Sequence, residues 1–197
     1  MSRSLSRNLR HVALVALLAA PIGANAESSS QTGVGAISTS ARVDFQITIP
    51  SFLSLRVGTA GAPIDLVNFT VPAANVGDAT PVAGTGGDLG AGSVTAAVLG
   101  NGGDVTLLAT TGGPIGNAAA GSISWSRITT ASSNPSLPAP VLADGASAGV
   151  AVAAANGVVN QTATWTYSYA NLDVIEAGTY GGVNANNSRV TYTASLP

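Results

Sequence analysis

The chain has 197 residues, of which 46% are apolar, only 8% are charged and none is cysteine. All seven basic residues are arginine, and the only histidine is His11. Without Cys, Lys or a His beyond the N-terminal region, the composition excludes Ser-His-Asp and Cys-His catalysis, Schiff-base chemistry and the usual zinc and copper sites. The formal net charge of −2 gives no basic surface for nucleic acid, so we expect no nucleic-acid partner.

Residues 1–26 have the pattern of a secretory signal peptide. Arg3, Arg7 and Arg10 precede an apolar run over 12–20, and Ala24-Asn25-Ala26 forms a small-residue exit. The run is too short for a membrane-spanning helix, which needs roughly 20 apolar residues. We therefore expect cleavage after Ala26, export to the periplasm, cell surface or medium, and no transmembrane segment in the mature chain.

Residues 27–40 are rich in Ser, Gly and Thr and predict a flexible N-terminal arm. From 42 to 49 apolar and polar residues alternate strictly, which is the period of a half-buried strand. One face of this predicted strand carries four apolar residues, Val43, Phe45, Ile47 and Ile49. Pro50 ends it.

Further strands are predicted along the rest of the chain, about nine in all. They cover 53–57, 64–71, 122–128 and 188–194, while the Gly-rich segment 72–92 is assigned none. Two Asn-Gly pairs predict type I′ hairpins because this turn needs positive φ values. Asn101-Gly102 would join strands at 93–99 and 104–109, and Asn156-Gly157 strands at 148–155 and 158–169.

No stretch of the mature chain has sustained helical periodicity, so the predicted class is all-β. Many short strands with polar turns favour a single antiparallel β-sandwich over residues 41–197, immunoglobulin-like or jelly-roll, with a barrel as the alternative.

Two groups of residues are candidates for binding or catalysis. Trp165, Tyr167 and Tyr169 form an aromatic stripe on one predicted strand face and Trp125 lies on another strand; such residues fill a core or stack on sugar rings. Asp173 and Glu176 are the nearest carboxylate pair that a glycosidase could use. Calcium could be bound by acidic residues in Gly-rich turns, namely Asp88, Asp104 and Asp144, but they form no dense calcium loop. We predict no catalytic residue, no metal and no cofactor.

The flexible arm followed by an alternating strand is suited to donor-strand exchange. In that mode one subunit adds a strand to an exposed sheet edge of its neighbour. Val43, Phe45, Ile47 and Ile49 would be the inserted side chains. The alternative is that this strand pairs within its own domain.

The C-terminal stretch Ala177-Gly178-Thr179-Tyr180, closing in Arg189-Val190-Thr191-Tyr192-Thr193-Ala194, resembles the end of several secreted bacterial β-sandwich proteins. These are pilin-like fimbrial subunits, spore-coat-U-type proteins and WxL surface proteins. The resemblance implies an immunoglobulin-like sandwich whose last strand is 188–194, exported and non-catalytic.

We therefore expect a non-enzymatic exported surface or structural protein, such as a self-associating fimbrial subunit whose partner is another copy. The alternative is a carbohydrate-binding module at the cell envelope that meets cell-surface glycans, and a glycosidase is the third reading.

Overall fold

The computed structural model describes residues 28–197, and the predicted signal peptide lies outside this range. The chain divides into two units, one ending at Thr48 and the other spanning Ile49–Pro197. Residues 28–52 contain no strand, so the strand predicted at 42–49 is not formed, and the first strand begins at Leu53. The reason lies in the pairing: an isolated strand has no partner for its backbone, and no ladder of either main sheet includes these residues.

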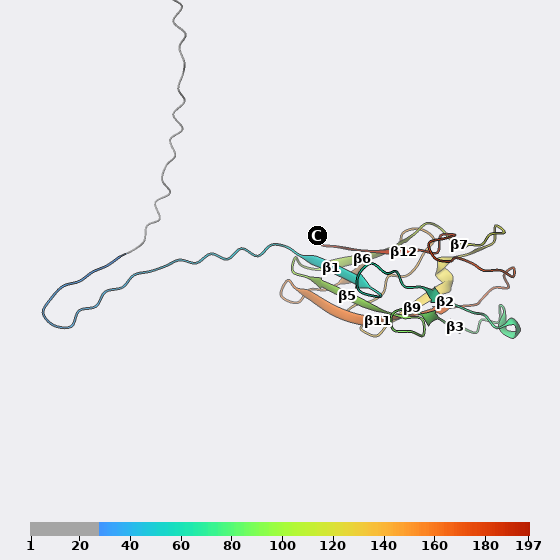
Figure 1. Cartoon of the computed structure of the whole chain (residues 1–197), viewed down its shortest axis with the longest axis horizontal. Coiled ribbons are helices and arrows are strands. Elements are labelled where there is room, and N and C mark those ends of the chain that lie inside the picture. Colours follow the sequence, from blue (N-terminus) through green and yellow to red (C-terminus); the bar gives the residue numbers. More distant parts are fainter. Residues whose placement is uncertain (1–27) are drawn as a thin grey trace, which may run out of the picture. The chain divides into compact units, whose positions relative to one another are not determined.

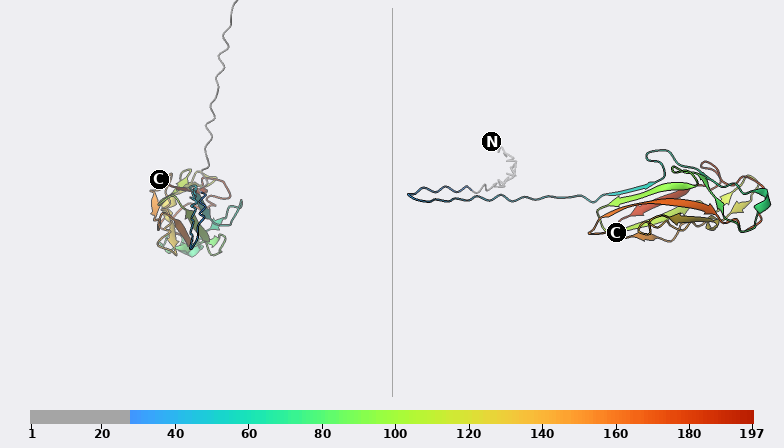
Figure 2. Two further views of the ribbon diagram at one scale, coloured as in Figure 1. Left: turned by 90° about the vertical axis from the view of Figure 1, so that its left-hand side faces the viewer. Right: turned by 90° about the horizontal axis from the view of Figure 1, so that it is seen from below.

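Ile49–Pro197 is an all-β domain with antiparallel pairing, as predicted (Figures 1 and 2). The larger sheet has the order β1-β5-β11-β3, and β9 also pairs with β11. Its strands are β1 (Leu53–Val57), β3 (Val82–Ala83), β5 (Ser93–Gly100), β9 (Ile128–Ser132) and β11 (Val159–Tyr169).

The smaller sheet has the order β10-β6-β12. Its strands are β6 (Val105–Thr111), β10 (Val150–Val152) and β12 (Val190–Ser195). Two short ribbons complete the fold: β2 (Val67–Asn68) with β4 (Thr85–Gly86), and β7 (Ile115–Gly116) with β8 (Ser122–Ile123). Single turns of 3₁₀ helix cover Ala73–Asn75 and Trp125–Arg127.

The core lies between the two main sheets because their strands alternate buried and exposed residues. On β5 and β6 every second residue is buried, and the same alternation holds on β11 except at Gln161, which is half-buried. Trp165 is fully buried and donates its indole N–H to the carbonyl of Leu137 at 3.2 Å. Its ring packs against Tyr192 of the opposite sheet with centroids 5.3 Å apart. This contact ties the two layers together.

Several predicted strands are shorter than their patterns indicate. The strand predicted at 64–71 survives only as β2, and the one predicted at 122–128 is interrupted by the 3₁₀ turn at Trp125. That turn forms because Ser124 caps it and Asp144 Oδ1 accepts the Trp125 N–H at 2.8 Å. The segment 72–92, predicted to hold no strand, contains the short β3 and β4.

The two Asn-Gly turns have different outcomes. Asn156 and Gly157 have φ values of 53° and 77°, as a type I′ turn requires, but pairing stops at the Ala155–Val158 bridge because β10 and β11 enter different sheets. The hairpin predicted at Asn101-Gly102 is wrong, since β5 and β6 also belong to different sheets. The Asn101 side chain is bound instead to Pro50 and Phe52.

Among residues 28–197, no helix has the length and apolar character needed to cross a membrane.

Candidate functional site: an open apolar groove

Each main sheet has an unpaired edge on the same side of the sandwich. β1 is the last strand of the larger sheet and β12 is the last strand of the smaller one. The two strands contact each other, and the start of β1 and the end of β12 both lie near the turn after β5. There Leu53 pairs with Gly100, and Gly102 lies against the side chain of Leu196. Figure 1 shows the C-terminus at the same end of the domain as the start of β1. We call this the closed end.

Away from the closed end the two edges border an apolar groove of about 1350 Å³. On one side it is lined by Leu55 and Val57 of β1 and by the segment 63–71; on the other side it is lined by 188–192, including the first half of β12. β2, within the first of these walls, is paired only with β4. The groove therefore runs between strand edges that have no partner among the described residues.

Many of the apolar side chains that line the groove pack against the core but are only partly buried. This set comprises Leu55, Val57, Val67, Phe69, Val71, Ile115, Ile123, Ile175, Val190 and Tyr192. Core-facing side chains of a closed sandwich are normally packed to near-crystalline density. The sandwich is therefore less densely packed at this position, and these apolar side chains are open to further contacts.

Aromatic rings form the floor of the groove. The hydroxyls of Tyr167 and Tyr192 are 2.8 Å apart, and the rings of Phe69 and Tyr169 have centroids 6.4 Å apart. Burial raises the pKa of Tyr192 well above its ordinary value, and the neighbouring Tyr167 adds to the effect. Burial also raises the pKa of Tyr167. The floor is therefore uncharged at neutral pH and suits an apolar occupant.

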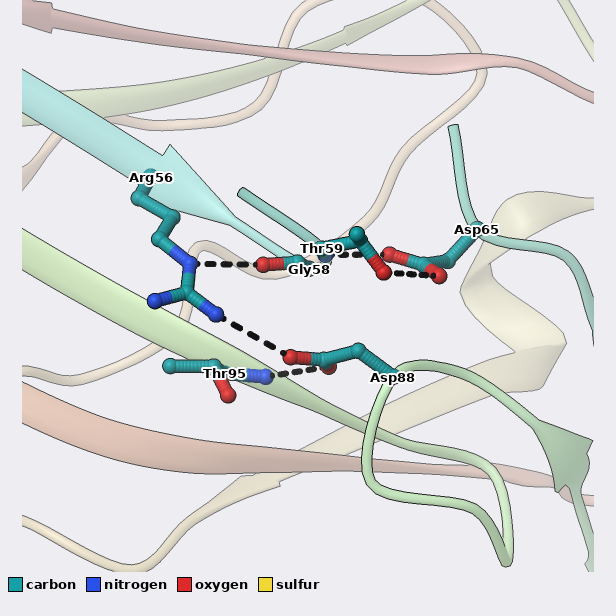
Figure 3. A network of polar contacts seen from close by, with 6 residues as sticks. All are labelled: Arg56, Gly58, Thr59, Asp65, Asp88 and Thr95. Atoms are coloured by element: carbon teal, nitrogen blue, oxygen red, sulfur yellow. Dashed lines mark hydrogen bonds and ion pairs between the residues drawn. The ribbon is translucent and has the colours of Figure 1, made fainter. Parts of the chain in front are cut away.

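A polar network holds the wall of the groove where β1 ends (Figure 3). The carboxylate of Asp65 accepts hydrogen bonds from the N–H and hydroxyl of Thr59, at 2.5 and 2.8 Å. Gly58 has a φ of +85°, and a Cβ at this position would collide with that carboxylate. The network fixes the turn that leads from β1 into the segment 63–71.

Arg56 and Asp88 form the second half of this network. Arg56 donates to the carbonyl of Gly58 at 2.8 Å, and its guanidinium lies 3.5 Å from Asp88. Burial alone raises the pKa of Asp88, but hydrogen bonding from Thr95 and the charge of Arg56 outweigh it, so the pKa lies below its ordinary value. Asp88 is therefore ionised and bridges β1 to the start of β5.

The segment before the domain carries a stripe of apolar side chains that are exposed to solvent. The four apolar side chains of the predicted donor strand are exposed: Val43 by 74%, Phe45 by 88%, Ile47 by 85% and Ile49 by 76%. Contiguous exposed apolar surface of this kind marks an interaction site. The sequence pattern located this stripe, but the groove depends on which strands lie at sheet edges and could not be seen in it.

The aromatic candidates for sugar stacking lie in the core. Exposed fractions are 6% for Trp125, 0% for Trp165, 9% for Tyr167 and 6% for Tyr169. Trp125 donates its indole N–H to the carbonyl of Gly113 at 2.9 Å. Trp125, Tyr167 and Tyr169 are also among the residues that line the groove.

The acidic candidates occupy separate structural roles. Asp173 pairs with Arg127 at 2.6 Å, and the backbone carbonyl of Glu176 accepts the Tyr180 hydroxyl at 3.0 Å. Both border a small pocket of about 420 Å³. Asp104 Oδ1 accepts the Ala154 N–H at 2.8 Å, and Asp144 caps the Trp125 turn. Within residues 28–197 no group of three His, Cys, Asp or Glu side chains is placed to hold a metal ion.

No protein-family model, curated protein or solved structure matches the chain. The functional argument therefore rests on the groove and the arm.

Proposed function

We propose that the protein is a non-enzymatic, exported structural subunit that assembles with copies of itself. In this assembly the residues 43–49 of one copy fill the groove of another and add a strand there. The observation that carries the proposal is the match between an uncovered stripe of four apolar side chains and a sandwich whose apolar groove is left open between two strand edges.

The lengths and chemistry of the two parts agree. Seven extended residues span about 20 Å, and alternate side chains of a strand point to the same face. All four apolar side chains would therefore enter the groove, while Asp44, Gln46 and Thr48 would face solvent. The inserted backbone would pair with the edge of β12, where N–H and C=O groups otherwise depend on water.

The energy scale is that of a moderate protein–protein interaction. Burying four such side chains contributes about 6–12 kcal/mol, at about 1.5–3 kcal/mol each. Association costs about 4–15 kcal/mol in lost motional freedom. Burial of the apolar stripe alone therefore roughly offsets the cost of association. Hydrogen bonds between the inserted strand and the sheet edge supply the net stability of the contact.

The test compares three forms by light scattering and negative-stain microscopy. They are the chain from Glu27, the same chain with Ile47→Asp, and a chain that begins at Ser51. We expect filaments or large oligomers only from the first form. Circular dichroism of the second form shows that the sandwich is intact, because Ile47 is 85% exposed in the free arm. A monomeric Glu27 chain at all concentrations would refute the proposal.

A further inference from the structure

Asn101 holds the short segment that joins the arm to β1. Its side-chain Nδ2 donates to the carbonyl of Pro50 at 2.9 Å, and its Oδ1 accepts the N–H of Phe52 at 2.6 Å. Its backbone N–H donates to the carbonyl of Phe52 at 3.2 Å. These three bonds fix the backbone on both sides of Ser51 against the turn after β5. We call this arrangement the Asn101 clamp.

The clamp lies at the closed end of the sandwich. Pro50 and Phe52 are bound beside residue 101, and the C-terminal residues 196 and 197 lie against Gly102 and Gly103. The groove is lined from Leu55 onward on β1, up to Tyr192 on β12 and by the loop residues 175–184, so it extends away from the closed end. The arm is therefore joined to the domain at the closed end, whereas the groove lies toward the opposite end.

An arm can enter a groove in two ways, and they differ in strand direction. To enter its own groove, the arm must turn back at 50–52 and would then run parallel to β12. The arm of a second copy, whose domain lies beyond the open end, would reach the closed end with Val43 and run antiparallel to β12. The first way needs a tight reversal in Pro50-Ser51-Phe52, which lacks the Gly or Asn of the two-residue hairpin turns whose twist suits paired strands.

We propose that Asn101 is a positioning residue that prevents the arm from filling its own groove and so directs it to a second copy. This inference rests on the proposed function and adds why the arm binds a second copy instead of its own domain. Since the donating and accepting surfaces lie toward opposite ends, the contact is heterologous, and its repetition generates head-to-tail chains or rings rather than two-fold dimers.

The test uses the chain from Glu27 with Asn101→Ala. A matched control is Asn160→Ala, which removes an exposed asparagine from β11. Light scattering measures the ratio of monomer to polymer, and chymotrypsin cleavage after Phe45 reports whether the arm is covered. Loss of two hydrogen bonds of ordinary strength corresponds to a change in that ratio of about 5- to 140-fold.

We expect Asn101→Ala to raise the proportion of monomer by this factor and to make Phe45 of the monomer resistant to chymotrypsin. Asn160→Ala should behave like the parent. Asn101→Asp keeps the acceptor for Phe52 but loses the donor to Pro50, so it should give an intermediate ratio. If Asn101→Ala does not fold, Pro50→Gly loosens the same segment with the clamp residue intact and should also yield protected monomer.

The outcomes separate the two proposals. Polymer formation by Asn101→Ala equal to that of the parent overturns the role of Asn101 and leaves the proposed function standing. Loss of polymer with rapid cleavage at Phe45 also overturns it, because the released arm has then not entered its own groove. A parent chain that is monomeric with Phe45 readily cleaved overturns the proposed function itself.

Discussion

Replacing Phe45 by alanine removes the largest apolar side chain of the arm without touching the sandwich. In the free arm this side chain is 88% exposed, so its loss should change the stability of the monomer by no more than about 0.5 kcal/mol. In the groove the same ring would be buried. Full burial of a Phe side chain contributes about 1.5–3 kcal/mol, and a cavity left behind brings the cost of Phe→Ala to about 3–5 kcal/mol.

We therefore expect Phe45→Ala to weaken each contact between copies by about 2–4 kcal/mol, which raises its dissociation constant about 30- to 700-fold. Sedimentation velocity over a concentration series measures this constant. Gln46→Ala is the control, because Gln46 lies on the opposite face of the same segment and should leave the constant unchanged. Equal effects of the two substitutions, or no effect of Phe45→Ala, would refute the reasoning.

Three predictions concern the domain itself. Gly58→Ala forces a Cβ toward the carboxylate of Asp65 at a φ of +85°, and urea unfolding should show a loss of at least about 1–2 kcal/mol. Thr130 has a buried hydroxyl without a partner, so Thr130→Val should leave the melting temperature unchanged or raise it, and a clear decrease would show that the hydroxyl is bonded. The lowered pKa of Asp88 stabilises the fold above the unfolded pKa of about 3.9 and ceases to do so as the pH falls through the folded value. Urea midpoints measured from pH 7 to lower pH should therefore fall less steeply below about pH 4 for Asp88→Asn than for the parent.

The fold class could be predicted because alternation of apolar residues is a local signal. β1 was predicted with its observed bounds, and the stripe of Trp165, Tyr167 and Tyr169 lies on β11 in the core. Strand pairing could not be predicted in the same way. Asn101-Gly102 has the composition of a hairpin turn, but its flanking strands enter different sheets and the asparagine binds the segment before β1.

Half of the candidate site could also be predicted. The alternation from Val43 to Ile49 identified the apolar stripe from neighbouring residues alone. The groove is built from β1 and the segment 63–71 on one side and from β12 on the other, and β12 is more than a hundred residues away from the first two in sequence. In the sequence its lining residues, such as Val57 and Val190, cannot be distinguished from core residues. They line a groove because, among the described residues, no strand covers them.

The absence of cysteine permits a direct test of the central claim. Two single variants, Ile47→Cys and Val190→Cys, are mixed and treated with a short bismaleimide, and the linked peptides are identified by mass spectrometry. The account predicts a crosslink between position 47 of one copy and position 190 of another. A control with Asn160→Cys, on the exposed face of β11, should give none. Equal crosslinking to positions 160 and 190, or none to position 190, would contradict the account.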